Sequence, residues 1–315
     1  NLIRPSALPY TTPTGKVYDS GDFAGTLARA QELIDWKGFN KRAALAKRAG
    51  KLRGIGIASF IEAAGGRAPS EDMRVRMDAE GHVTIFSGSH SHGQGHATVF
   101  AQLANEFLGV ALDKVTLVQG DTDFIPKGAI GTFGSRSSMM GGAGIKLASE
   151  KIIAKGKTIA GALMQAEPAA VSYSQGTFRA GASEVSFEAV ARAAWDASKL
   201  PEGVSPGLDE GHLYQREAEN FPNGSHVCEV EIDPELGTTE IVRYVAVDDC
   251  GNILNPMIVH GQVYGGVAQG IGQAVTENVI YDPEGQLVTA SYMDYGMPRA
   301  HHLAHVEAGF NTVPC

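Results

Sequence analysis

Residues 83–109 have the sequence VTIFSGSHSHGQGHATVFAQLANEFLG, in which a strand pattern, a glycine-rich turn and a helical pattern follow one another. Residues 83–86 favour a strand, because β-branched and aromatic side chains are typical of strands. After the glycines, Val99, Leu103 and Phe107 recur at the spacing of one helix face. The stretch therefore predicts a strand, a glycine-rich turn and a helix in direct succession, and the glycine after the helix is placed to end it.

A similar succession occurs a second time in the chain. Residues 74–78 and 83–86 predict one hairpin and residues 226–232 and 239–247 another, and a glycine-rich segment and a helix follow each of them. The repetition predicts an α+β fold of two related halves, each with an antiparallel hairpin, helices and glycine-rich loops. One ligand gripped between two similar halves is a natural geometry for this arrangement.

The predicted organisation has four parts. They are a lead-in segment at 1–50, a first half at 51–165, a connector at 166–220 and a second half at 221–315. The lead-in begins with a stretch rich in Pro, Thr and Gly, and the connector carries Pro, Ser and Gly with a weaker helix. We therefore expect the ligand to bind to the two halves.

Composition restricts the class of protein. Of 315 residues, 43% are hydrophobic and 19% charged, as is usual for globular proteins. The formal net charge is −9 and no Lys/Arg run occurs, which argues against a dedicated nucleic-acid or lipid binder. No stretch approaches the roughly 20 apolar residues of a transmembrane helix. The three cysteines lie far apart without CxxC spacing, so they indicate neither a disulfide framework nor a zinc site. We therefore expect a cytoplasmic protein, at most peripheral to the inner membrane.

Glycine is over-represented, with 39 of the 315 residues, and the glycines cluster at 88–95, 131–144 and 251–272. In the first cluster, Gly93-Gln94-Gly95-His96 opens a helix, where unpaired backbone N–H groups and the helix dipole favour an anionic group. The alternative is a tight turn whose glycines only supply positive φ.

Three histidines accompany this first cluster. His90 and His92 would share one face of an extended segment, as a hydrolytic metal site requires, with His96 nearby. No carboxylate or cysteine completes a ligand set at motif spacing. Hydrogen-bonding or solvent-facing histidines are therefore the simpler interpretation.

The second cluster, GTFGSRSSMMGGA at residues 131–143, combines hydroxyls, the guanidinium of Arg136 and flexible backbone ahead of a helix. Such groups suit an anion or a polar heterocycle. The alternative is a serine-rich surface loop with Arg136 in solvent.

The third cluster lies on a predicted helix that Asn255 caps and Pro256 begins. One face of this helix carries only amides and glycine, namely Gln262, Gly266, Gln269 and Gln273. The five glycines at 261–272 would cost a helix about 4–5 kcal/mol relative to alanine, so close packing of a ligand or another backbone must compensate. The amides offer donors and acceptors to a heterocycle edge, and a small-residue helix-packing seam is the alternative.

Spaced motifs along almost the whole chain resemble the molybdenum hydroxylases of the xanthine dehydrogenase and aldehyde oxidase type, most closely the aerobic carbon monoxide dehydrogenase-like large subunits. These motifs are YTTPTGKVYDSGDF (10–23), HGQGH (92–96), GTFGSRS (131–137), VDDCG (247–251), NP (255–256), GQVYGG (261–266), QGIG (269–272) and DY (294–295). They occur in the family's order.

The resemblance implies a molybdopterin cofactor carrying molybdenum, in its cytosine dinucleotide form, held between two glycine-rich halves. The cofactor-binding residues that it implies are Gly93, Gln94, Gly95, His96, Ser135, Arg136, Ser137, Gly141 and Gln262. No protein ligand to the metal is expected, because the cofactor itself holds the molybdenum in this family. Electrons would leave through iron-sulfur (Fe-S) and FAD subunits, and the implied assembly is a dimer of heterotrimers that includes the rest of the large subunit.

The family's general-base glutamate lies in a Gly-x-Gly-Glu-x-Gly motif beyond the position of Cys315, so no catalytic residue is expected within this chain. The family's upstream loop beside the metal is also outside it. We therefore expect a carboxy-proximal portion that neither turns over substrate nor retains the cofactor tightly alone.

Other interpretations stay open on the sequence. A non-catalytic scaffold domain would keep the fold without the chemistry, and a histidine-metal hydrolase would use His90 and His92. The substrate of the leading hypothesis is carbon monoxide, an aldehyde or an N-heterocycle.

Overall fold

The computed structural model describes residues 1–315 except 67, 126, 304 and 314–315. The chain forms two compact units, which we call unit 1 (residues 1–63 and 220–315) and unit 2 (residues 64–219). Both units combine helices with a sheet, which confirms the predicted α+β class.

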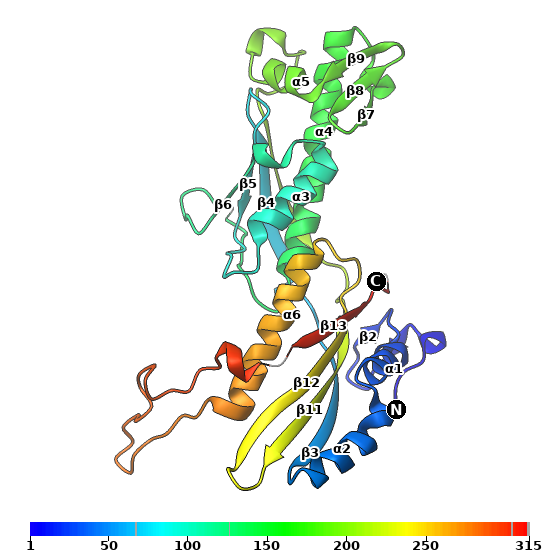
Figure 1. The fold of residues 1–315 in the computed structure, drawn as a ribbon. Coiled ribbons are helices and arrows are strands. Elements are labelled where there is room, and N and C mark those ends of the chain that lie inside the picture. Colours follow the sequence, from blue (N-terminus) through cyan, green and yellow to red (C-terminus); the bar gives the residue numbers. More distant parts are fainter. Residues whose placement is uncertain (67, 126, 304, 314–315) are drawn as a thin grey trace. The chain divides into compact units, whose positions relative to one another are not determined.

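Unit 2 is built on a four-stranded sheet of order β10-β4-β5-β6, of which Figure 1 labels β4, β5 and β6. Its strands are β4 (Ser70–Met77), β5 (Val83–Ser87), β6 (Val115–Gln119) and β10 (Leu208–Gln215). β4 and β5 form the predicted hairpin, and β5 continues through helix α3 (His96–Leu108) into the parallel strand β6. The apolar face of this sheet packs against α3 and α4 (Gly142–Met164), where Met73, Phe100 and Ile152 are fully buried or nearly so.

The segment 166–220 contributes to the core of unit 2, although the sequence predicts a connector there. It forms β7 (Ser172–Ser174), β8 (Thr177–Ala180), β9 (Ser183–Ser186), α5 (Phe187–Ala194) and the sheet strand β10. Phe178 and Phe187 meet edge to face with ring centroids 5.2 Å apart and join the same apolar cluster as α4. Burial of these aromatic rings explains why the segment folds onto unit 2.

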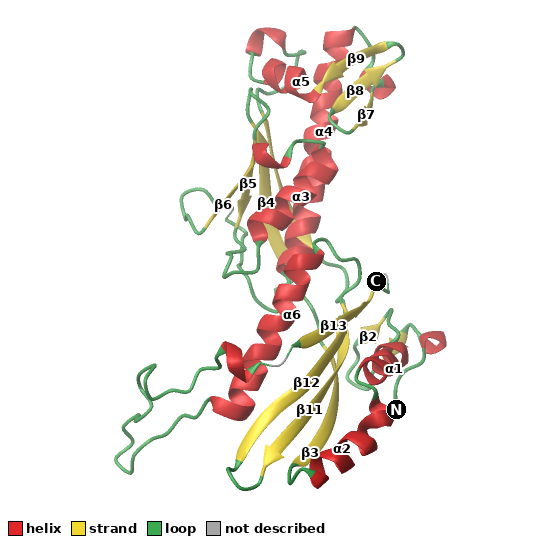
Figure 2. Ribbon diagram, viewed as in Figure 1, coloured by secondary structure: helices red, strands yellow, loops and turns green. Residues whose placement is uncertain are grey.

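Unit 1 is built on a sheet of order β13-β12-β11-β3. Its strands are β3 (Leu52–Ile61), β11 (Asn223–Asp233), β12 (Thr238–Asp249) and β13 (Val306–Asn311). Figure 2 shows helices on both sides of this sheet. Val245 and Val247 face α1 (Phe23–Leu33), whereas Ala246 between them faces α6 (Pro256–Ile271), as the alternation of side chains along a strand requires.

The two units share one topology, and each takes its antiparallel outer strand from the part of the sequence that precedes the other unit's hairpin. In each, a hairpin is followed by a helix and by a strand parallel to the hairpin's second strand, β4-β5-α3-β6 in unit 2 and β11-β12-α6-β13 in unit 1. The antiparallel outer strand of unit 1 is β3, which precedes the hairpin of unit 2, and that of unit 2 is β10, which precedes the hairpin of unit 1. The units therefore divide the chain differently from the consecutive halves that the sequence predicts.

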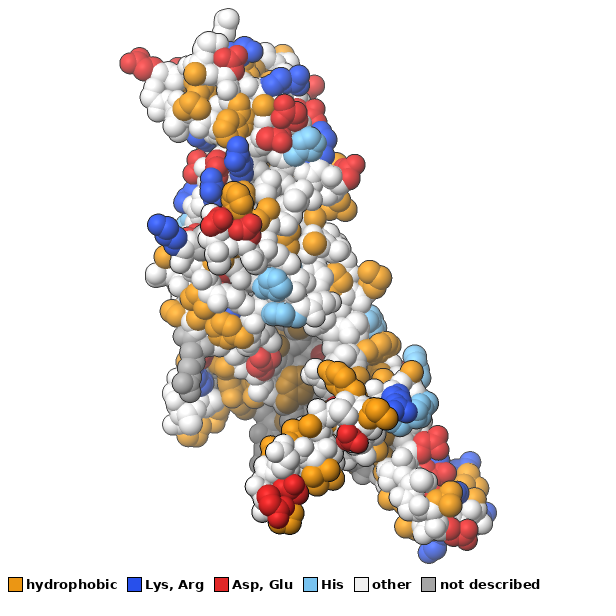
Figure 3. Space-filling model, turned by 90° about the vertical axis from the view of Figure 1, so that its left-hand side faces the viewer, with side chains coloured by type: hydrophobic (Ala, Val, Ile, Leu, Met, Phe, Trp, Pro, Cys, Tyr) orange, Lys and Arg blue, Asp and Glu red, His pale blue; other side chains and the backbone are white. Residues whose placement is uncertain are grey.

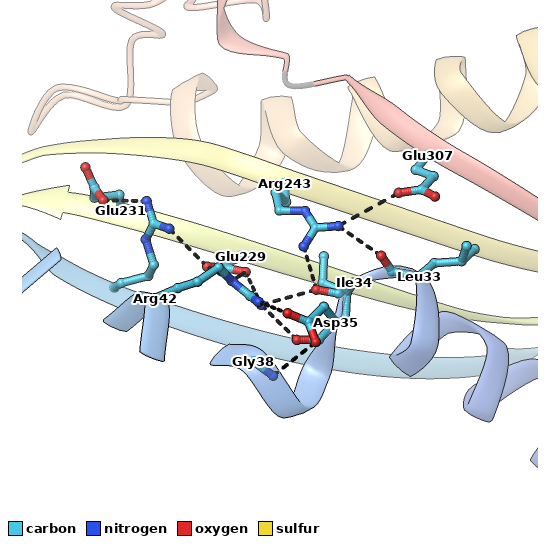
Figure 4. Close-up of polar contacts among 10 residues, drawn as sticks. Leu33, Ile34, Asp35, Gly38, Arg42, Glu229, Glu231, Arg243 and Glu307 are labelled. Carbon is cyan, nitrogen blue, oxygen red and sulfur yellow. Dashed lines mark hydrogen bonds and ion pairs between the residues drawn. The ribbon is translucent and has the colours of Figure 1, made fainter. Parts of the chain in front are cut away.

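The predicted lead-in is an integral part of unit 1. Polar contacts join the segment between helices α1 and α2 (Phe39–Arg48) to the sheet (Figure 4). Arg42 Nη2 lies 2.9 Å from a carboxylate oxygen of Glu229, whose side chain is fully buried. Arg243 donates to the carbonyl oxygens of Leu33 and Ile34 at 2.9 and 2.6 Å. A guanidinium at a helix C-terminus suits both the helix dipole and the unpaired carbonyls.

Shorter elements complete the two units. They are β1 (Tyr10–Thr11), β2 (Val17–Tyr18), the 3₁₀ turns Pro5–Ala7, Trp36–Gly38, Leu112–Lys114, Pro168–Ala170, Ala197–Lys199 and Ala300–His302, and the π-helical turns η4 (Ser137–Gly141) and η7 (Gly272–Thr276).

Two surface properties bear on the class of protein. On the face drawn in Figure 3, Lys and Arg side chains are interspersed with Asp and Glu. Within the part of the chain that the structure describes, no helix has the length and apolar character needed to cross a bilayer.

Candidate functional site

The first glycine cluster lies where β5 ends and α3 begins, at the carboxyl ends of the parallel strands β5 and β6. Gly93 and Gly95 have φ of 112° and 77°, a region that other residues rarely adopt. A Cβ added at Gly93 would meet no described atom within 4 Å, so the turn is open on its outer side. This position, beside the first unpaired N–H groups of α3, is where open α/β sheets place their ligands.

The side chain of Gln94 braces this turn. Its Nε2 donates to the carbonyl oxygen of His90 at 3.3 Å, and its Oε1 accepts from the backbone N–H of His92. The amide is only partly exposed. Gln94 therefore fixes the shape of the segment that precedes α3.

His96 is buried, although the sequence places it among the ligand-binding residues. Its side chain is 4% exposed, and its ring stacks on Phe100 with centroids 5.1 Å apart. Burial lowers the pKa of His96 below its ordinary value of 6.5. The His96 ring is thus neutral, and it packs against Phe100 inside the protein at the start of α3.

The second glycine cluster meets the first one in unit 2. Thr132 Oγ1 donates to the carbonyl oxygen of His90 at 2.8 Å, and Ser137 Oγ lies 3.3 Å from Thr132 Oγ1. A Cβ at Gly88 would overlap Ala129, so the first cluster packs closely against the residues that lead into the second one. Two segments more than 30 residues apart thereby form one platform that carries backbone N–H groups and hydroxyls.

Arg136 is also buried, and only 1% of the residue is exposed. Its guanidinium is ion-paired with Glu71, donates to the carbonyl oxygens of Gly131 (2.8 Å) and Ser70, and lies over the Phe133 ring at 5.2 Å. Both sequence interpretations, an anion ligand and a solvent-facing side chain, differ from this arrangement. The guanidinium faces the protein because a buried carboxylate on β4 is its partner.

Ser135 and Gly141 have distinct local roles. Ser135 is exposed and has a φ of 55°, at the tip of the loop. Gly141 is buried at the end of η4, where an added Cβ would lie 3.2 Å from Phe100 Cζ. Gly141 therefore lets the backbone pack closely against the Phe100 ring, which also stacks on His96.

The third cluster lies on α6 in unit 1. Asn255 caps this helix as predicted, its side chain accepting from the N–H of Ile258 at 3.1 Å. Val263, Val267 and Ile271 pack against the sheet, whereas Gln262 is exposed on another face. A Cβ added to any of the glycines at 261, 265, 266 or 270 would meet nothing within 4 Å. No described residue therefore packs against these glycines as the seam interpretation requires, and the face is open to a ligand.

The histidine pair of the first cluster lies on the surface. His90 and His92 are exposed, with ring centroids 5.3 Å apart. Among the described residues, no group of three or more His, Cys, Asp and Glu is placed to hold a metal ion.

A cavity of about 290 Å³ in unit 2 has Lys114 and Glu188 in its lining, and none of the predicted site residues lines it.

Sequence reasoning did not name three residues that shape the platform: Glu71, Thr132 and Arg216. Arg216 donates to the carbonyl oxygens of Ala64 and Gly66 at 2.7 Å each, and the N–H of Gly65 donates to Gly134 O. A signal for Glu71 was present, because the period of two along β4 places its carboxylate on the buried face with Met73. Thr132 also carries a signal, because it belongs to the hydroxyl-rich second cluster, whereas Arg216 carries none.

The fold and these loops define a class: an α+β protein with a glycine-rich platform of backbone N–H groups and hydroxyls in unit 2 and an open amide and glycine face in unit 1. The family model of the molybdopterin cofactor-binding domain matches residues 29–304. The chain belongs to this family of molybdenum hydroxylase-type proteins.

Relatives and solved structures agree with this assignment. The chain is 33% identical to the carbon monoxide dehydrogenase large chain of Hydrogenophaga pseudoflava, over all of this chain and 41% of that one. It is 36% identical to the nicotine 6-hydroxylase large subunit of Paenarthrobacter nicotinovorans, over 95% of this chain and 38% of that one. The crystal structure of quinoline 2-oxidoreductase from Pseudomonas putida 86 superposes with a TM-score of 0.89 and 31% identity, over 99% of this chain and 41% of the other. The chain thus spans about two fifths of the length of these relatives.

Proposed function

We propose that this chain is the molybdenum-cofactor-binding part of an oxidoreductase large subunit that hydroxylates or oxidises a small substrate. The single observation that carries the proposal is the open face of α6, where a Cβ added to any of its glycines would meet no described atom although each glycine lowers helix stability. A flat heterocycle lying on that face would give these glycines a function. The cofactor supplies two-electron oxidation chemistry at molybdenum when it is bound.

Each part of the chain then has a role towards the cofactor. The open turn at Gly93 and the first N–H groups of α3 favour its anionic groups, and Thr132, Ser135 and Ser137 add hydroxyls beside that turn. In unit 1, Gln262 offers an amide to the edge of the heterocycle. These residue types fit a pterin with a cytosine dinucleotide tail, which carries both a hydrogen-bonding ring edge and phosphates.

The proposed reaction and partners are suggested by the relatives. Their names specify carbon monoxide, nicotine and quinoline as molecules they act on, and we propose that this protein acts on a small molecule of that range. We further propose Fe-S and FAD partner subunits as electron acceptors, in a dimer of heterotrimers. The general base would be a glutamate on the part of the subunit outside this chain.

Metal and nucleotide analysis tests the proposal. The subunit that contains this chain, purified with its accompanying partners, is expected to contain stoichiometric molybdenum and to release cytidine monophosphate on acid hydrolysis. Iron and flavin in the same preparation would support the proposed partners. A preparation with the partners present but without molybdenum or pterin would contradict the proposed function and favour a scaffold role.

A further inference from the structure

The side chain of Arg136 is enclosed by unit 2. Its Nη1 donates to a carboxylate oxygen of Glu71 and to Gly131 O, its Nη2 donates to Ser70 O, and its guanidinium covers the ring of Phe133. Both members of the Arg136 and Glu71 pair have fully buried side chains. A ligand outside the protein surface therefore cannot reach this guanidinium without displacing the loop around it.

Glu71 lies on the buried face of β4, in line with Met73 and Val75. Burial raises the pKa of Glu71, and the ion pair with Arg136 acts in the opposite direction. Replacing a buried ion pair by apolar residues is often neutral for stability, whereas removing one partner leaves an unpaired buried charge. The pair is therefore better explained by the conformation it fixes than by the stability it adds.

The conformation fixed is that of the loop 131–137. Arg136 binds Gly131 O at the start of this loop, and the carbonyl oxygen of Arg136 itself accepts from Met140 N at 2.8 Å, inside η4. At the loop's middle, Gly134 O accepts from Gly65 N at 2.7 Å. The loop is thus held at both ends and at its centre, with Ser135 at positive φ on its exposed tip.

We propose that Arg136, through its ion pair with Glu71, is a positioning residue: it holds the loop 131–137 in the shape that presents Thr132, Ser135 and Ser137 to the cofactor. It does not contact the cofactor itself. This inference rests on the proposed function, because it assigns the loop to the molybdenum cofactor site. It replaces the expectation that Arg136 binds an anionic group directly.

Three variants of the assembled enzyme separate positioning from direct contact: Arg136→Met, Glu71→Met and the double variant. The fraction of molybdenum retained after prolonged dialysis and the rate of cofactor loss are measured for each. Hydrogen exchange of residues 131–137 is measured in cofactor-free enzyme as a readout independent of activity. The control is Arg29→Met, which removes an exposed ion pair with Glu32 in unit 1.

Positioning predicts that both single variants lose cofactor about tenfold to a hundredfold faster, as loss of supporting contacts around a bound group does. Hydrogen exchange of the loop should accelerate in both, and the double variant should be no worse than either single one, because it leaves no unpaired charge. The control should behave like the wild type. The double variant also provides a well-folded test if a single variant folds poorly.

Direct contact predicts a different pattern. Arg136→Met alone would then lose cofactor, while Glu71→Met, which frees the guanidinium, would retain it, and that result overturns the inference. Unchanged cofactor retention in folded Arg136→Met and double-variant enzyme would overturn it as well. Wild-type enzyme without molybdenum would overturn the proposed function and this inference together, whereas cofactor-bearing wild type with a normal Glu71→Met variant would overturn the inference alone.

Discussion

Single buried residues give the candidate site its shape, and His96 is the clearest case. The sequence HGQGH indicates a residue at a ligand, yet the ring lies under the glycine turn and stacks on Phe100. Arg136 behaves in the same way, because its partner Glu71 is 65 residues away in the sequence. A motif shows which residues gather at a site, but burial decides which of them face outward, and burial depends on partners that a local pattern does not contain.

The buried state of His96 predicts a pH dependence of stability. Because burial lowers its folded-state pKa below the unfolded value of about 6.5, its stabilising contribution is complete above that value and is lost as the pH falls through the folded-state pKa. The free energy of unfolding, measured by urea denaturation, should therefore decline as the pH falls below about 6.5. His96→Phe should keep the stack and make this decline shallower. The exposed His305→Gln control should leave the slope unchanged, and an equal slope in His96→Phe would contradict the assignment.

At the scale of elements, local patterns predicted most of the fold correctly. The hairpins β4-β5 and β11-β12 and the helix α3 are confirmed, because turn residues and side-chain periodicity are properties of neighbouring residues. The start of α6 at the Asn255 cap is confirmed for the same reason. Its glycine-rich face is the unusual feature, since the described residues leave it uncovered.

Gly266→Ala separates helix stability from ligand binding. The added methyl group meets no described atom, so helix propensity alone should stabilise unit 1 by about 1 kcal/mol in urea denaturation. If a cofactor lies on this face, the same methyl group should weaken cofactor retention in the assembled enzyme. Asn40→Ala, on the exposed side of α2, is the matched control that should raise helix stability without affecting the cofactor. Unchanged retention in Gly266→Ala would remove α6 from the site.

At the scale of the whole molecule, the sequence predicted two related halves but not which outer strand joins each sheet. The two strands of each hairpin are consecutive in the chain. The outer strands are not: β3 pairs with β11 from more than 160 residues away, and β10 pairs with β4. Choosing between an adjacent and a distant sheet edge depends on tertiary packing, which periodicity does not encode. The chain therefore passes between the units twice, near residues 63 and 220.

The central claim is that the glycine-rich segments of this chain bind the molybdenum cofactor. Hydrogen exchange of the assembled enzyme, with and without its molybdenum cofactor, tests this directly. The account predicts that the cofactor protects residues 92–96 and 131–137 in unit 2 together with residues 261–270 in unit 1. Absence of this protection from the three segments, in enzyme that carries molybdenum, would contradict it.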